Sequence, residues 1–176
     1  MMLKIKTLIL RGFLVGLFCC VTNDSPSVAE EADLLCMAEA IYFESRGEPE
    51  IGQLAVGITI KNRFKHPDYP DSICGVVRQG RYWQGVPLRD RCQFSYWCDG
   101  RPERIEDDEA WTTALGLAEL VLSTSLEIKG LEGVTHFHST KVKPVWSSQL
   151  LYKSTVGSHL FYVKKRSGVQ KVRLGS

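Results

Sequence analysis

The stretch that decides the fold is Glu31 to Arg46, which reads EADLLCMAEAIYFESR. Its apolar residues recur at three- and four-residue spacing, which is the stripe of an amphipathic helix. The positions of this stripe are Leu34, Leu35, Ala38, Ile41 and Tyr42. Gly47 and Pro49 follow, and they end the helix because glycine suits the left-handed cap and the residue before proline avoids the helical region. The spacing therefore predicts one helix over 31–46.

Two more helices and two strands are predicted outward from this stretch. Apolar spacing predicts a helix over 49–64 and another over 107–123, the latter behind acidic first-turn residues. Residues 134–138 and 159–163 alternate in polarity as short strands do, and they could pair in a small sheet. The fold class is therefore α+β, mainly helical, with a small antiparallel sheet or hairpin.

Residues 72–104 show no sustained periodicity and are rich in Gly, Cys, Gln, Arg and aromatic residues. We interpret them as a long loop region held by a disulfide. Long loops in compact domains are often functional.

The N-terminus has the pattern of a secretory signal. Basic residues at Lys4, Lys6 and Arg11 precede an apolar run over 12–21, and Ser27-Val28-Ala29 follows as a small-residue cleavage site. We predict a signal peptide over 1–29; the alternative is an uncleaved N-terminal anchor. No stable membrane insertion is expected after cleavage, because the apolar run is shorter than the ~20 residues that span a bilayer.

One domain is expected over 30–165, followed by a basic flexible tail over 166–176, because 176 residues suit a single core. Removing the signal segment takes away three basic residues and one acidic residue, so the net charge of +2 falls to 0. A domain without excess positive charge is not expected to bind nucleic acid.

Four cysteines remain after the signal segment, at Cys36, Cys74, Cys92 and Cys98. An even number in an exported chain favours disulfides, and three pairings are possible. Because Cys92 and Cys98 enclose only QFSYW, we predict a local disulfide there, which leaves Cys36 with Cys74. The alternatives are four free thiols or a zinc site, although the chain has no C-x-x-C pair.

Glu44 is the candidate catalytic acid. It lies near the carbonyl end of the predicted helix, which disfavours negative charge, and the preceding Tyr42-Phe43 pair could shield the carboxyl from water. Both effects raise the pKa, and a glycosidase needs a carboxyl that is still protonated near neutral pH. Arg46 opposes this if it pairs with Glu44, but not if it pairs with Glu48 or Asp99. The alternative is an ordinary surface glutamate.

Two further groups of residues carry chemistry. The segment CQFSYWCDG at 92–100 places aromatic rings beside amide, hydroxyl and carboxylate groups, as carbohydrate sites do, although its rings could equally be core. His136, His138 and His159 could hold zinc with a carboxylate, and alternation places His136 and His138 on one face of a strand. No H-E-x-x-H signature supports a metal site.

Eight short segments occur in a recognisable order. They are CMAEAIYFESRGE at 36–48, GQLAV at 52–56, KNR at 61–63, ICGVV at 73–77, CQFSYWCDG at 92–100, THFH at 135–138, KPVW at 143–146 and GSHLFY at 157–162. Together they resemble the SleB-type cell wall hydrolase family, which includes spore cortex-lytic enzymes and related proteins of Gram-negative bacteria. The resemblance runs from about Leu35 to Val163.

The resemblance implies a lysozyme or lytic transglycosylase-like domain with one catalytic glutamate in an E-A-R-G-E motif. That glutamate falls on Glu44, and Ser45 stands where the motif has alanine. The family's other motif positions imply a set of substrate-binding residues that line or brace the cleft. These are Glu48, Gln93, Ser95, Asp99, His136 and His159.

The implied activity is cleavage of the β-1,4 bond between muramic acid and N-acetylglucosamine in peptidoglycan. Glu44 acts as acid and then as base, and the muramic acid 6-hydroxyl attacks to leave a 1,6-anhydro end, as in a lytic transglycosylase. If Asp99 or Glu48 lies across the cleft, water attacks instead and leaves a reducing end. No metal or other cofactor is expected, and the protein should act in the periplasm or cell envelope. The alternatives are a non-catalytic peptidoglycan-binding domain and a zinc-dependent amidase or peptidase that uses the histidines.

Overall fold

The computed structural model describes residues 27–164. The predicted basic tail and most of the predicted signal peptide lie outside the described residues. Helix α1, Val28–Ser45, begins earlier than the sequence predicts, because Ser27 caps it. The Ser27 hydroxyl accepts the Glu30 N–H while the Glu30 carboxylate accepts the Ser27 N–H, which is a capping box. The predicted cleavage point after Ala29 therefore falls inside the first turn of α1.

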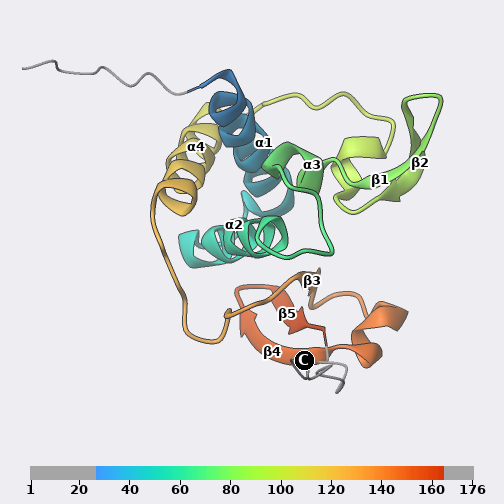
Figure 1. Ribbon diagram of the computed structural model, residues 1–176. Helices are drawn as coiled ribbons and strands as arrows, with labels where there is room; N and C mark the ends of the chain where they lie inside the picture. The colour runs from blue at the N-terminus through green and yellow to red at the C-terminus, as the bar shows by residue number, and fades with distance from the viewer. Residues whose placement is uncertain (1–26, 165–176) are drawn as a thin grey trace, which may run out of the picture.

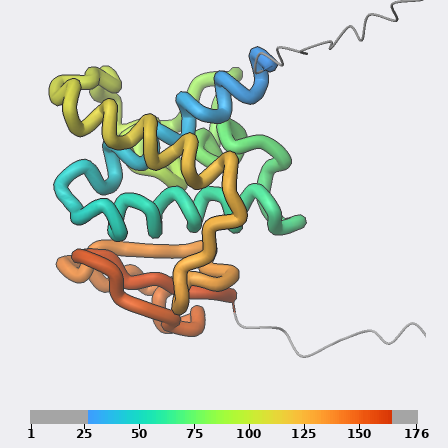
Figure 2. Tube along the Cα trace, turned by 90° about the vertical axis from the view of Figure 1, so that its left-hand side faces the viewer, coloured from blue at the N-terminus to red at the C-terminus, as the bar shows by residue number. Residues whose placement is uncertain are grey.

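Three long helices pack together in the structure, and they confirm the three helices that the sequence predicts. Helix α2 spans Glu50–Phe64 and helix α4 spans Asp108–Ser123, with Asp107 as the cap of α4. They pack around α1, whose central residues are fully buried (Figures 1 and 2). The three helices meet closely at Gly57, where an added Cβ would lie 3.2 Å from both Ile41 Cδ1 and Val121 Cγ2.

The interpretation of 72–104 as a loop was wrong over much of its length. The segment forms the short helix α3, Ile73–Val77, the antiparallel strands β1, Gly80–Trp83, and β2, Val86–Cys92, and the 3-10 helix η1, Ser95–Cys98. Strand β1 is exposed at every position, so it has no buried face to produce an alternating pattern. A left-handed turn joins the strands, with φ of 49° at Gln84 and 81° at Gly85.

A three-stranded antiparallel sheet lies beside α2, as Figure 1 shows in orange and red. Its order is β3 (His136–Ser139), β5 (His159–Val163), β4 (Leu151–Val156), and the 3-10 helix η2 (Val145–Gln149) precedes β4. The predicted pairing of the two strands is confirmed, with Phe137 opposite Phe161. Strand β4 was missed, because most of its residues are exposed.

Both predicted disulfides are present. Cys36 in α1 is bonded to Cys74 in α3 with a Cα–Cα distance of 5.2 Å, and Cys92 is bonded to Cys98 at 6.1 Å. The first bond ties α3 to the helical core, and the second closes the segment that joins β2 to η1. Over residues 27–164, the structure has no helix with the length and apolar character needed to cross a bilayer.

Candidate active site

A cavity of about 670 Å³ lies between the helices and the three-stranded sheet. It brings together most of the residues that the sequence predicts for the site. They are Glu44, Glu48, Gln93, Ser95, His136 and His159. They come from α1, the turn after it, the β2–η1 segment, β3 and β5, so the site exists only once the sheet is placed against the helices.

Glu44 lies in the last turn of α1, and its carboxyl faces this cavity. Burial raises the pKa of Glu44 to about 7, and the nearby Arg63 partly opposes this effect. In the described part of the chain the carboxyl makes no hydrogen bond or ion pair. Arg46 does not pair with it, since its guanidinium lies over the Tyr42 ring at 4.8 Å from the centroid. Glu44 is thus a protonatable carboxyl that is free to meet a ligand.

Glu48 is the second carboxylate at the cavity, and it is fully engaged. One oxygen accepts the Ser158 N–H at 2.8 Å and the other accepts the Ser158 hydroxyl. These hydrogen bonds lower the pKa of Glu48. Ser158 follows Gly157, whose φ is +57° and where an added Cβ would lie 2.1 Å from Glu48 Oε2. Glu48 therefore binds the β4–β5 turn and braces the cavity wall.

Arg63 is a buried cation at the cavity that the sequence analysis did not single out. Its side chain is 4% exposed, and its Nε donates to the Thr135 carbonyl at 2.6 Å. Its guanidinium lies over Phe94 at 5.3 Å and over Tyr69 at 5.6 Å. Nη1 is buried without a hydrogen-bond partner among the described residues. The only signal for Arg63 in the sequence was its place in the KNR segment.

Of the three predicted histidines, His136 and His138 lie on the edge strand β3, and His159 lies on the neighbouring strand β5. The rings of His136 and His138 lie beside Trp146, at 5.5 and 5.4 Å between centroids. His159 contacts Phe137 at 5.3 Å, on the opposite face of the sheet. Within residues 27–164, no group of three or more His, Cys, Asp or Glu residues is arranged to hold a metal ion. The arrangement gives no support to the zinc alternative.

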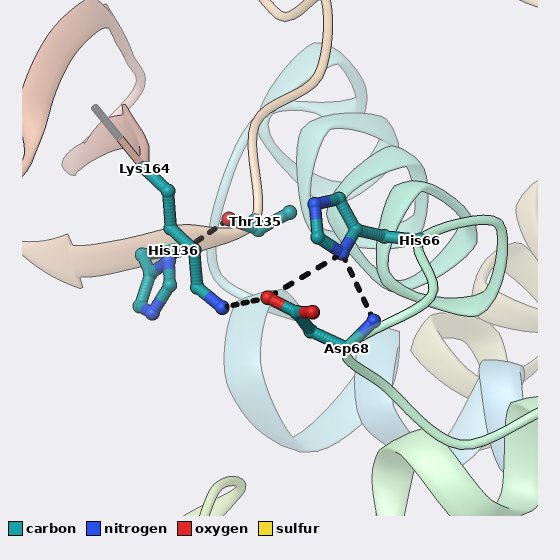
Figure 3. A network of polar contacts seen from close by, with 5 residues as sticks. All are labelled: His66, Asp68, Thr135, His136 and Lys164. Atoms are coloured by element: carbon teal, nitrogen blue, oxygen red, sulfur yellow. Dashed lines mark hydrogen bonds and ion pairs between the residues drawn. The ribbon is translucent and has the colours of Figure 1, made fainter. Parts of the chain in front are cut away.

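The protonation of two of these rings follows from their surroundings. Burial, followed by the charge of Arg63, lowers the pKa of His136 to about 4, and Lys164 adds to this effect. Figure 3 shows His136 next to Thr135, whose hydroxyl is 2.9 Å from Nδ1, and the Lys164–Asp68 ion pair nearby. Burial also lowers the pKa of His159, although Glu48 opposes it. Both rings are neutral at pH 7 and can offer hydrogen bonds without charge.

The Cys92–Cys98 segment contributes polar groups to the cavity, while its aromatic rings pack elsewhere. Gln93 and Ser95 line the cavity, whereas Phe94 between them is 1% exposed and belongs to the core. Tyr96 stacks on Phe43 at 4.7 Å. The aromatic rings that do line the cavity include Trp146 and Phe137, which the sequence placed only in the KPVW and THFH segments.

Asp99 is the one predicted site residue that the structure does not bring to this cavity. It lines a separate hollow of about 410 Å³ with Arg46 and Tyr96, and its Oδ1 accepts the Arg101 N–H at 2.7 Å. The hydroxyl of Ser158 and the ring of His138 are additional groups at the main cavity. His138 is fixed between the Ser139 carbonyl and the Tyr162 hydroxyl, both at 2.9 Å.

Comparison with protein families gives one match, to the model described as Cell Wall Hydrolase, over residues 47–162. The match begins just after Glu44. Spore cortex-lytic enzymes are similar in sequence. That of Halalkalibacterium halodurans is 44% identical over 52 residues, which are 30% of this chain and 16% of that protein. That of Bacillus cereus is 39% identical over 61 residues, or 35% of this chain and 24% of that protein. The matched segments are thus a small part of these relatives.

Two solved structures share the fold. The catalytic domain of the germination-specific lytic transglycosylase SleB from Bacillus anthracis aligns with a TM-score of 0.58 and 24% identity, over 78% of this chain and 99% of that one. The catalytic domain of the Bacillus cereus SleB protein aligns with a TM-score of 0.53 and 23% identity, over 80% of this chain and 96% of that one. The predicted mainly helical α+β fold with a small sheet agrees with both.

Proposed function

The chain belongs to the cell wall hydrolase family, and from this premise we propose that it cleaves the glycan strands of peptidoglycan. The bond cut is the β-1,4 link between muramic acid and N-acetylglucosamine. The observation that carries the proposal is Glu44, a carboxyl with a pKa of about 7 that faces a cavity and makes no hydrogen bond or ion pair with residues 27–164. Such a carboxyl is protonated in part of the population at neutral pH and can give its proton to a glycosidic oxygen.

The arrangement of carboxylates favours a lytic transglycosylase. Among the described residues, the only carboxylates that line the cavity are Glu44 and Glu48, and both oxygens of Glu48 are held by Ser158. Asp99 lies at a different hollow. A hydrolase that inverts or retains configuration uses two working carboxyl groups, and the second is lacking here. An intramolecular nucleophile removes the need for it.

The proposed reaction then needs Glu44 alone. Its proton passes to the glycosidic oxygen as the bond from that oxygen to C1 of muramic acid breaks. The carboxylate that remains takes the proton of the 6-hydroxyl, whose oxygen forms the new bond to C1. The products are a 1,6-anhydromuramic end and a free 4-hydroxyl, and Glu44 is again protonated. Gln93, Ser95 and the neutral His136 and His159 can hold sugar hydroxyl and amide groups during these steps.

We also propose that the protein is exported and acts in the periplasm or cell envelope. Peptidoglycan lies there, the N-terminal sequence has the signal pattern, and two disulfides suit an oxidising compartment.

The test is digestion of purified sacculi by residues 27–176, which retain the Ser27 cap, and by the Glu44→Gln variant. Mass spectrometry identifies the muropeptides released. Anhydro ends released only by the unmutated protein are expected, while reducing ends would mean hydrolysis by water. Glu119→Gln is the matched control, because Glu119 is exposed on α4 and is not among the residues that line the cavity. Binding to sacculi without cleavage by either protein would make this a binding domain, and loss of activity on chelation would support a zinc enzyme.

A further inference from the structure

The steps proposed above give no role to the buried positive charge of Arg63. A guanidinium keeps its proton at any pH that a folded protein meets, so a buried arginine is a permanent charge. Burying such a charge costs free energy unless hydrogen bonds or an opposite charge compensate it. Arg63 is 4% exposed and makes one hydrogen bond among residues 27–164, so its position needs another explanation.

The guanidinium is held rigidly by groups that carry no charge. Nε is bound to the Thr135 carbonyl, and the rings of Phe94 and Tyr69 lie against the planar group. These contacts come from the loop before β3, the β2–η1 segment and the loop after α2. They fix where the positive charge lies, and they leave Nη1 without a hydrogen-bond partner in the described part of the chain. The lining of the cavity includes both Arg63 and Glu44.

Glu44 faces several titratable groups, but Arg63 is the one that carries a permanent charge. The other groups are Tyr96 of η1, His136 and His138 of β3, His159 of β5 and Glu48 of the turn after α1. Burial raises the pKa of Tyr96 and lowers those of His136 and His159, so these three are neutral near pH 7. Glu48 is held by Ser158. Of these groups, Arg63 is the one whose charge lowers the pKa of Glu44.

We propose that Arg63 is a positioning residue that supplies a fixed positive charge to the carboxylate formed on Glu44 when its proton leaves. This inference rests on the proposed function, because the carboxylate is the intermediate state of the acid in that reaction. Glu44 and Arg63 form no ion pair in the resting structure, so the acid can stay protonated. The attraction grows when Glu44 becomes negative, which lowers the cost of the proton transfer without a movement of the arginine.

The first test observes this coupling directly and needs no substrate. In the unmutated protein, the side-chain Nε–H resonance of Arg63 should shift with pH with a midpoint near the pKa of Glu44, about 7. In Glu44→Gln this titration should disappear, because the variant has no proton to lose. An Arg63 resonance that does not titrate, or one that titrates equally in both proteins, would overturn the inference. Neither result depends on whether the protein cleaves sacculi.

The second test changes the charge. Arg63→Gln should raise the midpoint of Glu44, followed by its side-chain ¹³C resonance, by about one pH unit or more. Arg63→Lys keeps a charge and should raise it less. Asn62→Ala is the matched control, since Asn62 also ties α2 to the segment before β3, at the Leu131 and Val134 carbonyls, but does not line the cavity.

The control separates an electrostatic role from a structural one. If Asn62→Ala moves the midpoint of Glu44 as much as Arg63→Gln does, Arg63 acts only by holding the sheet in place. If Arg63→Gln does not fold, Arg63→Lys and the resonance titration decide the matter.

Discussion

Glu44 owes its chemistry to two opposed effects that act on a single side chain. Burial raises its pKa and the charge of Arg63 lowers it, and the result is about 7. Burial alone would leave a weaker acid, and a close ion pair would leave a carboxylate with no proton to give. A fixed cation beyond ion-pair distance gives an acid strength between these extremes, which suits an enzyme that works near neutral pH.

The rate of cleavage should depend on pH through Glu44. The acid acts in its protonated form, so kcat/KM is expected to be constant below pH 7 and to fall about tenfold per pH unit above it. His136, with a pKa of about 4, and His159, whose pKa is also lowered, stay neutral in this range. The measurement is the initial rate on soluble glycan fragments from pH 5 to 9. A rate that is unchanged between pH 7 and 9 would contradict the assignment.

The same carboxyl should cost stability at high pH. The folded state holds the proton of Glu44 more tightly than the unfolded state, whose glutamate has the ordinary pKa of 4.5, so the free energy of unfolding falls as pH rises from 4.5 to about 7. Glu44→Gln removes this loss. The free energy of unfolding of the variant should exceed that of the unmutated protein by up to about 3 kcal/mol at pH 8, and the two should be equal at pH 4. Urea unfolding at both pH values checks this, and equal differences at the two would exclude it.

Among the elements, the turn after α1 and the β4–β5 turn are joined by Glu48 and Ser158. The Gly157 backbone passes so close to the carboxylate that a side chain there would collide with it, and its φ of +57° also favours glycine. This contact sets the distance between the helical part and the sheet on one side of the cavity. Glu48 thus has a structural role beside Glu44, the proposed catalytic acid.

Replacing Glu48 by Gln should weaken the contact with Ser158 that braces this side of the cavity. The variant loses charge-assisted hydrogen bonds and is expected to be about 1 to 2 kcal/mol less stable at pH 7. The hydrogen bonds with Ser158 lower the pKa of Glu48 below its ordinary value of 4.5. Its contribution is therefore present above pH 4.5 and is lost as pH falls through the lowered pKa. Thermal unfolding followed from pH 7 down to about pH 2 measures this, with Glu119→Gln as the control; a deficit that stays the same over the whole range would argue against the charged clamp.

At the scale of the whole molecule, the site lies where the helical part faces the sheet. The two disulfides are therefore placed differently with respect to the site. Cys36–Cys74 ties elements of the helical part across 38 residues, whereas Cys92–Cys98 encloses a segment of the cavity wall that contains Gln93 and Ser95. Figure 2 shows the helices stacked above the sheet, with the chain crossing between the two parts after α4.

The two disulfides should therefore differ in what their loss affects most: loss of Cys36–Cys74 should lower stability more, and loss of Cys92–Cys98 should lower cleavage more. Replacing Cys36 and Cys74 by serine removes the longer loop closure and should cost about 4 kcal/mol, against about 2 kcal/mol for Cys92 and Cys98. Cleavage of sacculi under conditions where both variants are folded should fall more for the second pair, because it positions the cavity wall. Unfolding curves test the prediction on stability, and muropeptide release tests the prediction on cleavage. If the same pair of substitutions caused the larger loss in both assays, the prediction would be contradicted.

The three long helices were predictable because each has an apolar face of sufficient length, and the cysteine spacing was enough to pair the disulfides. The hairpin β1–β2 and strand β4 were not, since their exposed residues leave no periodic signal. At the site, one motif predicted Glu44 as the acid and placed Glu48 at the cleft, but the sequence left open whether Glu48 acts across the cleft or, as in the structure, is held by Ser158. Asp99 appeared equivalent to Gln93 and Ser95 on the same short segment, yet it lies at another hollow.

The sequence by itself determined the helices, the pairing of the disulfides and the choice of Glu44 as the proposed acid, because spacing along the chain and residue type suffice for these. Only the tertiary structure decided which residues surround Glu44, because they come from distant segments; Glu48 and Ser158, for example, are 110 residues apart. Burial, the place of the Arg63 charge and the engagement of Glu48 by Ser158 all arise when the sheet packs on the helices. The acidity of Glu44 is therefore a property of the folded molecule, set by the exclusion of water and by the charge of Arg63, which packing brings near.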